Sequence, residues 1–244
     1  MSAVQQADEP LAVAAIDLGA TSGRVMLGVV DHGRIELVPA HRFENRLQDV
    51  DGQLRWDIDA LWAEVRQGLR AAHEGAVARG MGGLASIGVD SWAVDYGLVG
   101  PDVVEADGAS LPGSGEVFGG VVAYRDGRTD GIAESFAEDV PRERQYALTG
   151  IAQQPFNTLY QLVADDRLAG LPGGTTLLML PDLLGYRLTG RRRTERTNAS
   201  STGMLALEQQ DWSHELLDAA GVDPALLAPL LSPGERLGTV LPQL

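Results

Sequence analysis

The chain has no cysteine among its 244 residues. It therefore cannot form a disulfide, a thiolate metal site or a cysteine nucleophile, and this composition suits a reducing compartment. Long apolar runs are also missing, since none approaches the roughly 20 residues needed to span a bilayer. The first ten residues are polar and acidic, unlike a secretory signal. We therefore expect a cytoplasmic protein without a membrane anchor.

Basic residues are scarce. The sequence carries 19 Lys and Arg against 34 Asp and Glu, which gives a formal net charge of -15. This balance disfavours nucleic acid or an anionic membrane as the main partner. A hydrophobic fraction of 44% is sufficient for the core of one large domain or two small ones.

The order of the apolar segments predicts an α/β fold. Residues 11–16 and 25–30 are short apolar runs typical of buried strands, and residues 34–38 follow an Asp-His-Gly turn. Apolar residues between 58 and 72 recur at helical spacing, with Asp57 or Asp59 expected as the N-cap. Residues 84–89 form another compact apolar run. This order indicates an antiparallel meander followed by a helix and a further strand.

The second half of the chain mixes loops and helices. Residues 100–120 are rich in Gly, Pro, Asp and Ser, which predicts a surface loop or long hairpin before a strand at 121–124. Gly190 and Gly221 are expected to stop helices. The predicted helices cover residues 130–136, 155–164, 181–188 and 213–220.

One segment has the composition of a phosphate site. Residues 15–24 read Ala-Ile-Asp-Leu-Gly-Ala-Thr-Ser-Gly-Arg. The glycines let backbone approach a phosphate, Thr21 and Ser22 offer hydroxyl donors, and Arg24 can neutralise charge. Asp17 could hold Mg²⁺ through its water shell. The spacing matches neither common glycine-rich nucleotide loop, and a plain hairpin turn explains the composition equally well.

Resemblance to known proteins decides between these interpretations. The pattern Asp-x-Gly-x-Thr-x-x-Arg at 17–24 resembles the first phosphate turn of the actin, chaperone and sugar-kinase superfamily. Other segments are similar to FGGY carbohydrate kinases and, within that family, to the L-rhamnulose kinases. They follow in matching order from about residue 13 to the C-terminus. These segments are 41–45, 56–59, 86–96, 123–129, 155–161, 180–182, 186–190 and 197–199.

The resemblance implies a ribonuclease-H-like lobe of the actin-like ATPase superfamily, an α/β unit with a mixed five-stranded sheet and flanking helices. We expect a disordered leader at 1–10, the FGGY N-terminal domain at 11–232, and at 233–244 the start of a linker to a missing C-terminal lobe; a frayed chain end is the alternative for the last stretch. The catalytic Asp base is expected beyond Leu244, because none of the four histidines is followed by Asp. The isolated chain is therefore predicted to be inactive.

The implied reaction transfers the γ-phosphoryl group of ATP, with Mg²⁺, to a ketose hydroxyl, and in the rhamnulose case it yields the 1-phosphate. Asp17 matches the Mg²⁺ position of the family. The expected partners are ATP, the ketose and the C-terminal lobe. The residues that match the ATP phosphate segment are Ala20, Thr21, Ser22, Gly23 and Arg24.

Sugar contacts are implied at three places. Rhamnulokinases usually have Gly where this chain has Ala93, so a kinase for fuculose, xylulose or ribulose stays open, as does a non-catalytic sugar- or nucleotide-binding module. For Tyr124 and Phe156, core packing is the commoner role of an aromatic residue. Residues 191–193, three arginines, are expected to form a solvated basic turn. The candidate sugar-binding residues are Ser91, Trp92, Ala93, Tyr124, Asp126, Phe156 and Asn157.

Overall fold

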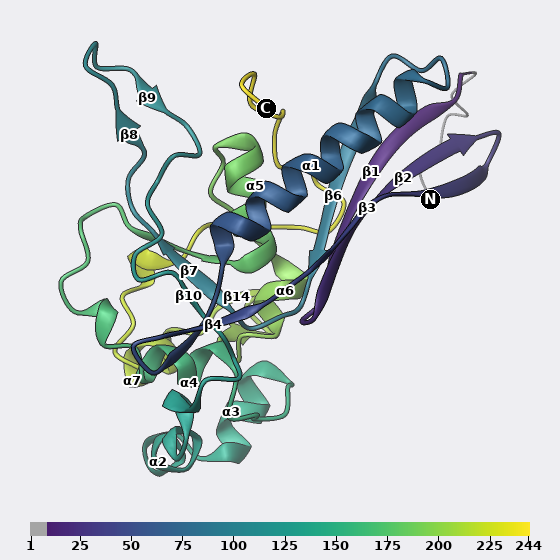
Figure 1. The fold of residues 1–244 in the computed structure, drawn as a ribbon. Coiled ribbons are helices and arrows are strands. Elements are labelled where there is room, and N and C mark those ends of the chain that lie inside the picture. Colours follow the sequence, from purple (N-terminus) through teal and green to yellow (C-terminus); the bar gives the residue numbers. More distant parts are fainter. Residues whose placement is uncertain (1–8) are drawn as a thin grey trace. The chain divides into compact units, whose positions relative to one another are not determined.

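A computed structural model describes residues 9–244 (Figure 1). The predicted leader at 1–10 therefore lies almost entirely outside the described residues. The chain divides into two compact units. The first contains the chain up to Arg46 together with Asp57–Trp92, and the second contains Leu47–Trp56 and Ala93–Leu244.

The first unit is built on a mixed four-stranded sheet. Its strand order is β3 (Arg34–Glu44), β2 (Ser22–Asp31), β1 (Leu11–Leu18) and β6 (Leu84–Ser91). The first three strands form the predicted antiparallel meander, and β6 runs parallel to β1.

The prediction of five strands was wrong. Among the described residues, the only strand hydrogen-bonded to β6 is β1. The next strand of the chain, β7 (Tyr96–Val99), pairs antiparallel with β11 (Thr176–Met179) in the second unit. The backbone N–H and C=O groups of β7 therefore bond to β11, and β7 does not become a fifth strand of the sheet in the first unit.

Helix α1 (Ile58–Val77) covers this sheet. Asp57 is the N-cap, and its side chain accepts a 2.9 Å hydrogen bond from the backbone N–H of Ala60. On the predicted apolar face, Ile58, Leu61, Val65 and Ala72 are buried while Trp62 and Leu69 are half-buried. Gly68 lies so close to β2 that a Cβ there would be 2.4 Å from Val25. Glycine therefore lets the helix approach the sheet closely.

The second unit contains several small sheets. The hairpin β4 (Leu47–Val50) and β5 (Gln53–Trp56) pairs with β10 (Val121–Val122), and the predicted loop at 100–120 carries the short hairpin β8 (Val103–Val104) and β9 (Ser110–Leu111). The remaining strand pairs are β12 (Thr194–Glu195) with β15 (Leu230–Leu231), and β13 (Leu205–Ala206) with β14 (Asp211–Trp212).

The second unit also contains six α-helices among the described residues. They are α2 (Ile132–Asp139), α3 (Arg142–Thr149), α4 (Thr158–Val163), α5 (Leu180–Thr189), α6 (Arg196–Ser200) and α7 (His214–Ala219). Short 3-10 turns lie at Gly127–Thr129, Asp166–Leu168 and Pro224–Leu226. Gly190 and Gly221 have positive φ angles of 69° and 66° after α5 and α7, as predicted for helix stops. Among the described residues, no helix has the length and apolar character needed to cross a bilayer.

Candidate functional site

The predicted phosphate segment forms the turn between β1 and β2. The backbone N–H of Gly19 donates to the carbonyl of Ser22 at 2.9 Å. Asn45, just past β3, fixes the turn from the side: its backbone N–H donates to Thr21 O at 3.1 Å and its side-chain amide to Gly19 O at 3.2 Å. Within residues 9–244, the N–H groups of Ala20 and Thr21 donate no hydrogen bond. The turn is thus held at its ends while its tip keeps free donors.

Asp17 and Arg24 flank this turn. They are direct partners in the β1–β2 ladder, with 2.7 Å between Arg24 Nε and Asp17 Oδ2. Their side chains are 40% and 58% exposed. The pair therefore presents one carboxylate and one guanidinium to solvent beside the free N–H groups.

Gly23 has a packing role in this turn. It is buried, and a Cβ at this position would be 2.3 Å from the ring of Phe43 on β3 and 3.0 Å from Leu18. The ring fills the space that a side chain would need. Glycine is required at this position because the Phe43 ring packs directly against its Cα.

Ser91 and Trp92 lie at the same edge of the sheet as this turn. Ser91 is the parallel partner of Leu18, and the Trp92 backbone N–H donates to Leu18 O at 3.0 Å. The carboxyl ends of the neighbouring parallel strands β1 and β6 therefore bring one candidate sugar segment next to the candidate phosphate segment. Such strand ends are where α/β sheets place ligands.

Ala93 begins the long segment of the second unit, and the residue after it has an unusual backbone. Val94 has a φ of 70° and is 6% exposed. Its carbonyl accepts hydrogen bonds from Thr158 Oγ1 at 2.8 Å and Gln161 Nε2 at 3.1 Å. The family segments include these three residues, but the positive φ of Val94 was not predictable, because β-branched side chains disfavour that conformation.

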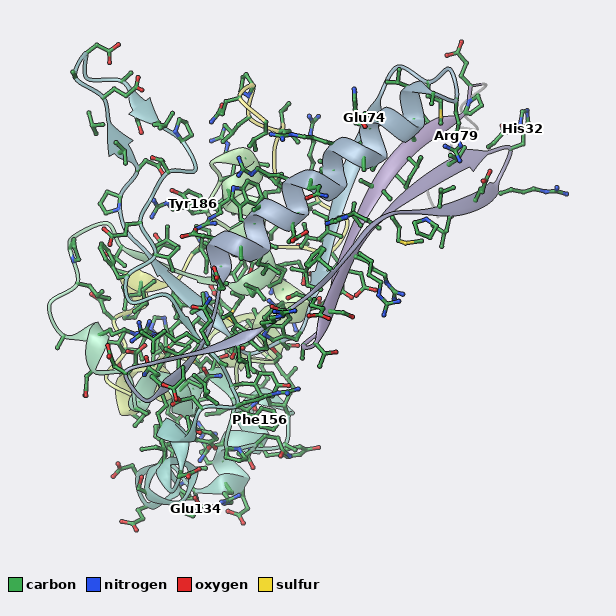
Figure 2. All side chains as sticks on the ribbon, viewed as in Figure 1. His32, Glu74, Arg79, Glu134, Phe156 and Tyr186 are labelled. Carbon is green, nitrogen blue, oxygen red and sulfur yellow. The ribbon has the colours of Figure 1, made fainter. Side chains whose placement is uncertain are left out.

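Tyr124 and Phe156 come together in the second unit. Their ring centroids are 5.9 Å apart in an edge-to-face arrangement, and the Arg125 guanidinium lies 5.3 Å from the Tyr124 ring. Phe156, labelled in Figure 2, is 38% exposed, so the interpretation of this residue as core packing was wrong. The two rings form a partly open aromatic surface.

Asn157 is buried, the Asp126 side chain is 8% exposed, and both are engaged with backbone groups. Asp126 accepts from the backbone N–H groups of Leu54 at 2.8 Å and Arg128 at 3.0 Å. Asn157 accepts from Gln154 N at 2.6 Å and donates to Ser201 O at 3.0 Å. Both side chains fix local backbone before α4 and around the turn at Gly127–Thr129.

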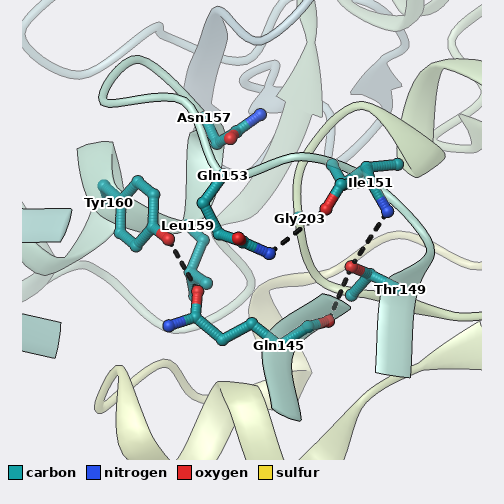
Figure 3. Close-up of a pocket in the computed structure, with 8 residues that line it drawn as sticks. All are labelled: Gln145, Thr149, Ile151, Gln153, Asn157, Leu159, Tyr160 and Gly203. Carbon is teal, nitrogen blue, oxygen red and sulfur yellow. Dashed lines mark hydrogen bonds between the residues drawn. The ribbon is translucent and has the colours of Figure 1, made fainter. Parts of the chain in front are cut away.

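A cavity of about 10 Å³ lies beside Asn157, and Figure 3 shows its lining. Its polar groups bond to one another and to backbone: Tyr160 donates to Gln145 Oε1 at 2.6 Å, and Thr149 Oγ1 donates to Gln145 O at 2.8 Å. This volume is close to that of a single water probe. The cavity is therefore far too small for a sugar.

The basic turn at 191–193 differs from expectation at its central residue. Arg192 is only 20% exposed and stacks on the Tyr186 ring at 4.9 Å. Its guanidinium donates to the carbonyls of Val99 and Gly100 at 3.1 and 2.6 Å. The prediction of a solvated turn was therefore wrong for Arg192, whose hydrogen bonds and ring contact link the end of β7 to α5. Arg191 and Arg193 are exposed.

Asp182 on α5 is a carboxyl group with a strongly raised pKa. It is 9% exposed, accepts from the Glu195 backbone N–H at 3.0 Å, and keeps Oδ2 without a hydrogen bond in the described structure. Burial is the largest cause that raises the pKa of Asp182, the backbone hydrogen bond from Glu195 opposes it, and the nearby Glu195 charge adds to it, which together bring the pKa to about 7. The group anchors β12 to α5.

Several curated relatives of this chain are named rhamnulokinase. The protein from Enterococcus faecalis is 37% identical over 92% of this chain, and that from Yersinia pestis (strain Pestoides F) is 40% identical over 92%. The aligned region covers 42% and 44% of those proteins. The chain thus spans less than half the length of the curated relatives it matches.

Solved structures show the same fold at low sequence identity. A gluconate kinase from Lactobacillus acidophilus matches 96% of this chain and 44% of its own, with a TM-score of 0.74 and 18% identity. A xylulose kinase from Rhodospirillum rubrum matches 95% and 46%, with a TM-score of 0.73 and 22% identity. These matches show that the chain shares the α/β fold of these kinases.

The family comparison covers nearly all of the chain. The sequence model described as the FGGY family of carbohydrate kinases, N-terminal domain, matches residues 12–244. This range contains the β1–β2 turn, the end of β6 and all the candidate residues of the second unit. The chain therefore belongs to the FGGY family of carbohydrate kinases and carries its N-terminal domain.

Proposed function

We propose that this chain is the N-terminal lobe of an ATP-dependent ketose kinase that converts L-rhamnulose to L-rhamnulose 1-phosphate. The observation that carries the proposal is the name rhamnulokinase on curated relatives that are 34–40% identical over 92–94% of the chain. Identity at this level, sustained along the whole lobe, favours a shared substrate class more strongly than the fold does.

The β1–β2 turn is proposed to hold the phosphates of ATP. Its free N–H groups and the exposed Arg24 guanidinium suit phosphate oxygens, which prefer backbone donors and bidentate cations. Their role is to orient the transferred group and stabilise its charge. The residues assigned to this role are Ala20, Thr21, Ser22, Gly23 and Arg24.

Asp17 is proposed to serve Mg²⁺, which would neutralise charge on the phosphates. Within residues 9–244 there is no group of three or more His, Asp or Glu side chains suited to a metal. One exposed carboxylate beside phosphate donors still fits, because Mg²⁺ commonly takes one or two carboxylates and draws its other ligands from phosphates and water.

The residues proposed to bind the sugar are Ser91, Trp92, Ala93, Tyr124, Asp126, Phe156 and Asn157. Ser91 and Trp92 end β6 beside the phosphate turn. In the second unit, the rings of Tyr124 and Phe156 offer an apolar surface for the C–H face of a ketose. Asp126 and Asn157 either hold the local backbone in place or exchange their backbone hydrogen bonds for bonds to sugar hydroxyls. The methyl group of Ala93 reduces the space available to the sugar.

The Ala93 methyl also supports a second candidate function, a kinase for another ketose such as fuculose, xylulose or ribulose. The deciding experiment is ATP-dependent phosphorylation of L-rhamnulose, L-fuculose, D-xylulose and D-ribulose by the 244-residue chain and by the full product of its gene. We expect the full product to favour L-rhamnulose and the 244-residue chain to be nearly inactive.

The assay has three contrary outcomes. If the full product prefers another ketose, that ketose would replace L-rhamnulose as the proposed substrate. Binding of ATP or sugar without turnover in the full product would indicate a non-catalytic binding module. Turnover by the 244-residue chain at the rate of the full product would show that this lobe carries its own catalytic base.

A further inference from the structure

Val94 has a backbone conformation that its side chain disfavours. A φ of 70° lies in the left-handed region, which a β-branched residue adopts only when its surroundings enforce it. Residues held in this way are concentrated at ligand sites. Val94 follows directly on Ser91, Trp92 and Ala93, one of the three segments proposed to contact the sugar.

Two buried polar side chains hold this peptide. Thr158, the first residue of α4, donates from Oγ1 to the Val94 carbonyl at 2.8 Å, and Gln161 donates from Nε2 at 3.1 Å. Thr158 is 0% exposed and Gln161 is 1% exposed. Water therefore cannot replace either donor, and both bonds fix the direction of the same carbonyl.

Gln161 also contacts the other two proposed sugar segments. Its Nε2 donates to the carbonyl of Phe156 at 2.8 Å, and its Oε1 accepts from Arg128 Nη2 at 2.6 Å. Because a guanidinium can only donate, this contact assigns the oxygen end of the Gln161 amide and directs its nitrogen toward Val94 and Phe156. Arg128 in turn presents its backbone N–H to Asp126.

We propose that Gln161 and Thr158 are positioning residues of the sugar site: they hold Val94 in its left-handed conformation, and Gln161 joins the segments around Ala93, Asp126 and Phe156 through one amide. This inference rests on the proposed function. Neither side chain touches the sugar, since both are buried and already bonded. Their effect is on the placement of the groups that do.

The test uses the full product of the gene, with KM measured separately for L-rhamnulose and ATP. Thr158→Val keeps the shape and removes one donor to Val94, and Gln161→Leu removes the amide. We expect each to raise the ketose KM by about tenfold or more while the ATP KM stays within about twofold, because small displacements of sugar contacts are costly. Thr158→Ser keeps the donor and should retain the wild-type ketose KM.

Thr149→Val is the matched control. Thr149 is also a buried threonine whose hydroxyl donates to a carbonyl, that of Gln145 at 2.8 Å, but the contact is internal to α3. It should leave both KM values unchanged. If the Thr158 and Gln161 variants behave like this control, or raise both KM values equally, the positioning role is wrong.

A second variant tests the strained peptide itself. Glycine adopts a φ of 70° without steric cost, so Val94→Gly combined with Thr158→Val should recover part of the ketose KM lost in Thr158→Val alone. No recovery would count against the inference. Wild-type protein that phosphorylates no ketose would instead overturn the proposed function and this inference with it, and the two failures are distinguished by wild-type turnover.

Discussion

The Arg24 guanidinium and the Asp17 carboxylate face each other across the β1–β2 ladder, with 2.5 Å between Nη2 and Oδ2. Both side chains are substantially exposed, and an exposed ion pair typically contributes about 0–1 kcal/mol to stability. The pair is therefore a poor stabilising element for its sheet. Its position beside the free N–H groups of the turn fits a role in holding phosphate charge.

The first prediction separates these two roles. In the full product of the gene, Asp17→Asn and Arg24→Gln should each lower ATP-dependent turnover by about 100-fold, the scale of losing one preorganised electrostatic group. Each should change the free energy of unfolding by less than about 1 kcal/mol. Steady-state kinetics and urea denaturation measure the two quantities.

Glu44→Gln provides the control, because Glu44 and Arg46 form another exposed ion pair in the same unit. This variant should leave turnover unchanged. Wild-type turnover in Asp17→Asn would remove Asp17 from the proposed Mg²⁺ site.

The second prediction concerns Gly23. A Cβ there would be 2.3 Å from the Phe43 ring, which is 8% exposed and cannot move freely. Gly23→Ala should therefore lower the free energy of unfolding by about 1–3 kcal/mol through overpacking. Urea denaturation of the 244-residue chain, followed by circular dichroism, gives the value.

Gly88→Ala is the matched variant on the same sheet. Gly88 lies in β6 with no heavy atom within 4 Å of its Cβ position and no positive φ. Alanine here should leave stability unchanged or raise it slightly, because glycine loses more backbone entropy on folding. Equal destabilisation by both substitutions would contradict the packing role of Gly23.

Periodic patterns predicted much of the first unit. The apolar face of α1, its Asp57 cap and the meander of β1 to β3 all follow from local sequence, and the structure confirms them. The number of strands in the sheet does not follow, because pairing of β7 with β11 joins residues about 80 positions apart. Local pattern does not reveal which strand a buried strand pairs with.

Local signals also miss the interactions that organise the second unit. Tyr96 donates a 2.6 Å hydrogen bond to Asp165, and Asp165 pairs with Arg167 at 2.6 Å, although 69 residues separate Tyr96 from Asp165. The β4–β5 hairpin is different, because its Asp51-Gly52 turn has positive φ at both residues and the dipeptide is a hairpin signal. That hairpin was predictable and was missed.

The candidate site shows the same division. The order of motifs identified the β1–β2 turn, and parallel pairing of β1 with β6 brings Ser91 to its edge. The conformation of Val94 was not predictable, because valine favours extended backbone and its left-handed state depends on Thr158 and Gln161. Such conflicts between local preference and observed structure are typical of functional sites.

The third prediction concerns Arg192. Arg192→Met keeps much of the side-chain volume but leaves the carbonyls of Val99 and Gly100 without this donor and removes the stack on Tyr186. The free energy of unfolding should fall by about 2–4 kcal/mol, the cost of losing a partly buried, multiply bonded charge. Denaturant unfolding of the 244-residue chain measures it.

Arg191→Met is the neighbouring control. Arg191 is exposed, so its substitution should change stability by no more than about 0.5 kcal/mol. If both variants lower the free energy of unfolding by similar amounts, the contacts of Arg192 contribute no more to stability than those of an exposed arginine.

The fourth prediction is a pH dependence from Asp182. Burial raises the pKa of this carboxyl group from 3.8 to about 7 in the folded chain. Between these values the folded state keeps the proton and the unfolded state releases it. The unfolded state thus binds fewer protons, and the stability contributed by Asp182 falls as pH rises from about 4 to about 7.

Asp182→Asn removes the titration while its carbonyl oxygen can still accept from the Glu195 N–H, which lies 3.0 Å from Asp182 Oδ1. The free energy of unfolding of the variant minus that of the wild type should therefore rise between about pH 4 and about pH 7, as unfolding at fixed ionic strength would show. Asp218→Asn, at an exposed position on α7, controls for the loss of one negative charge and should give a flat difference. A flat difference for Asp182→Asn as well would mean that the Asp182 carboxyl group is ionised in the folded chain.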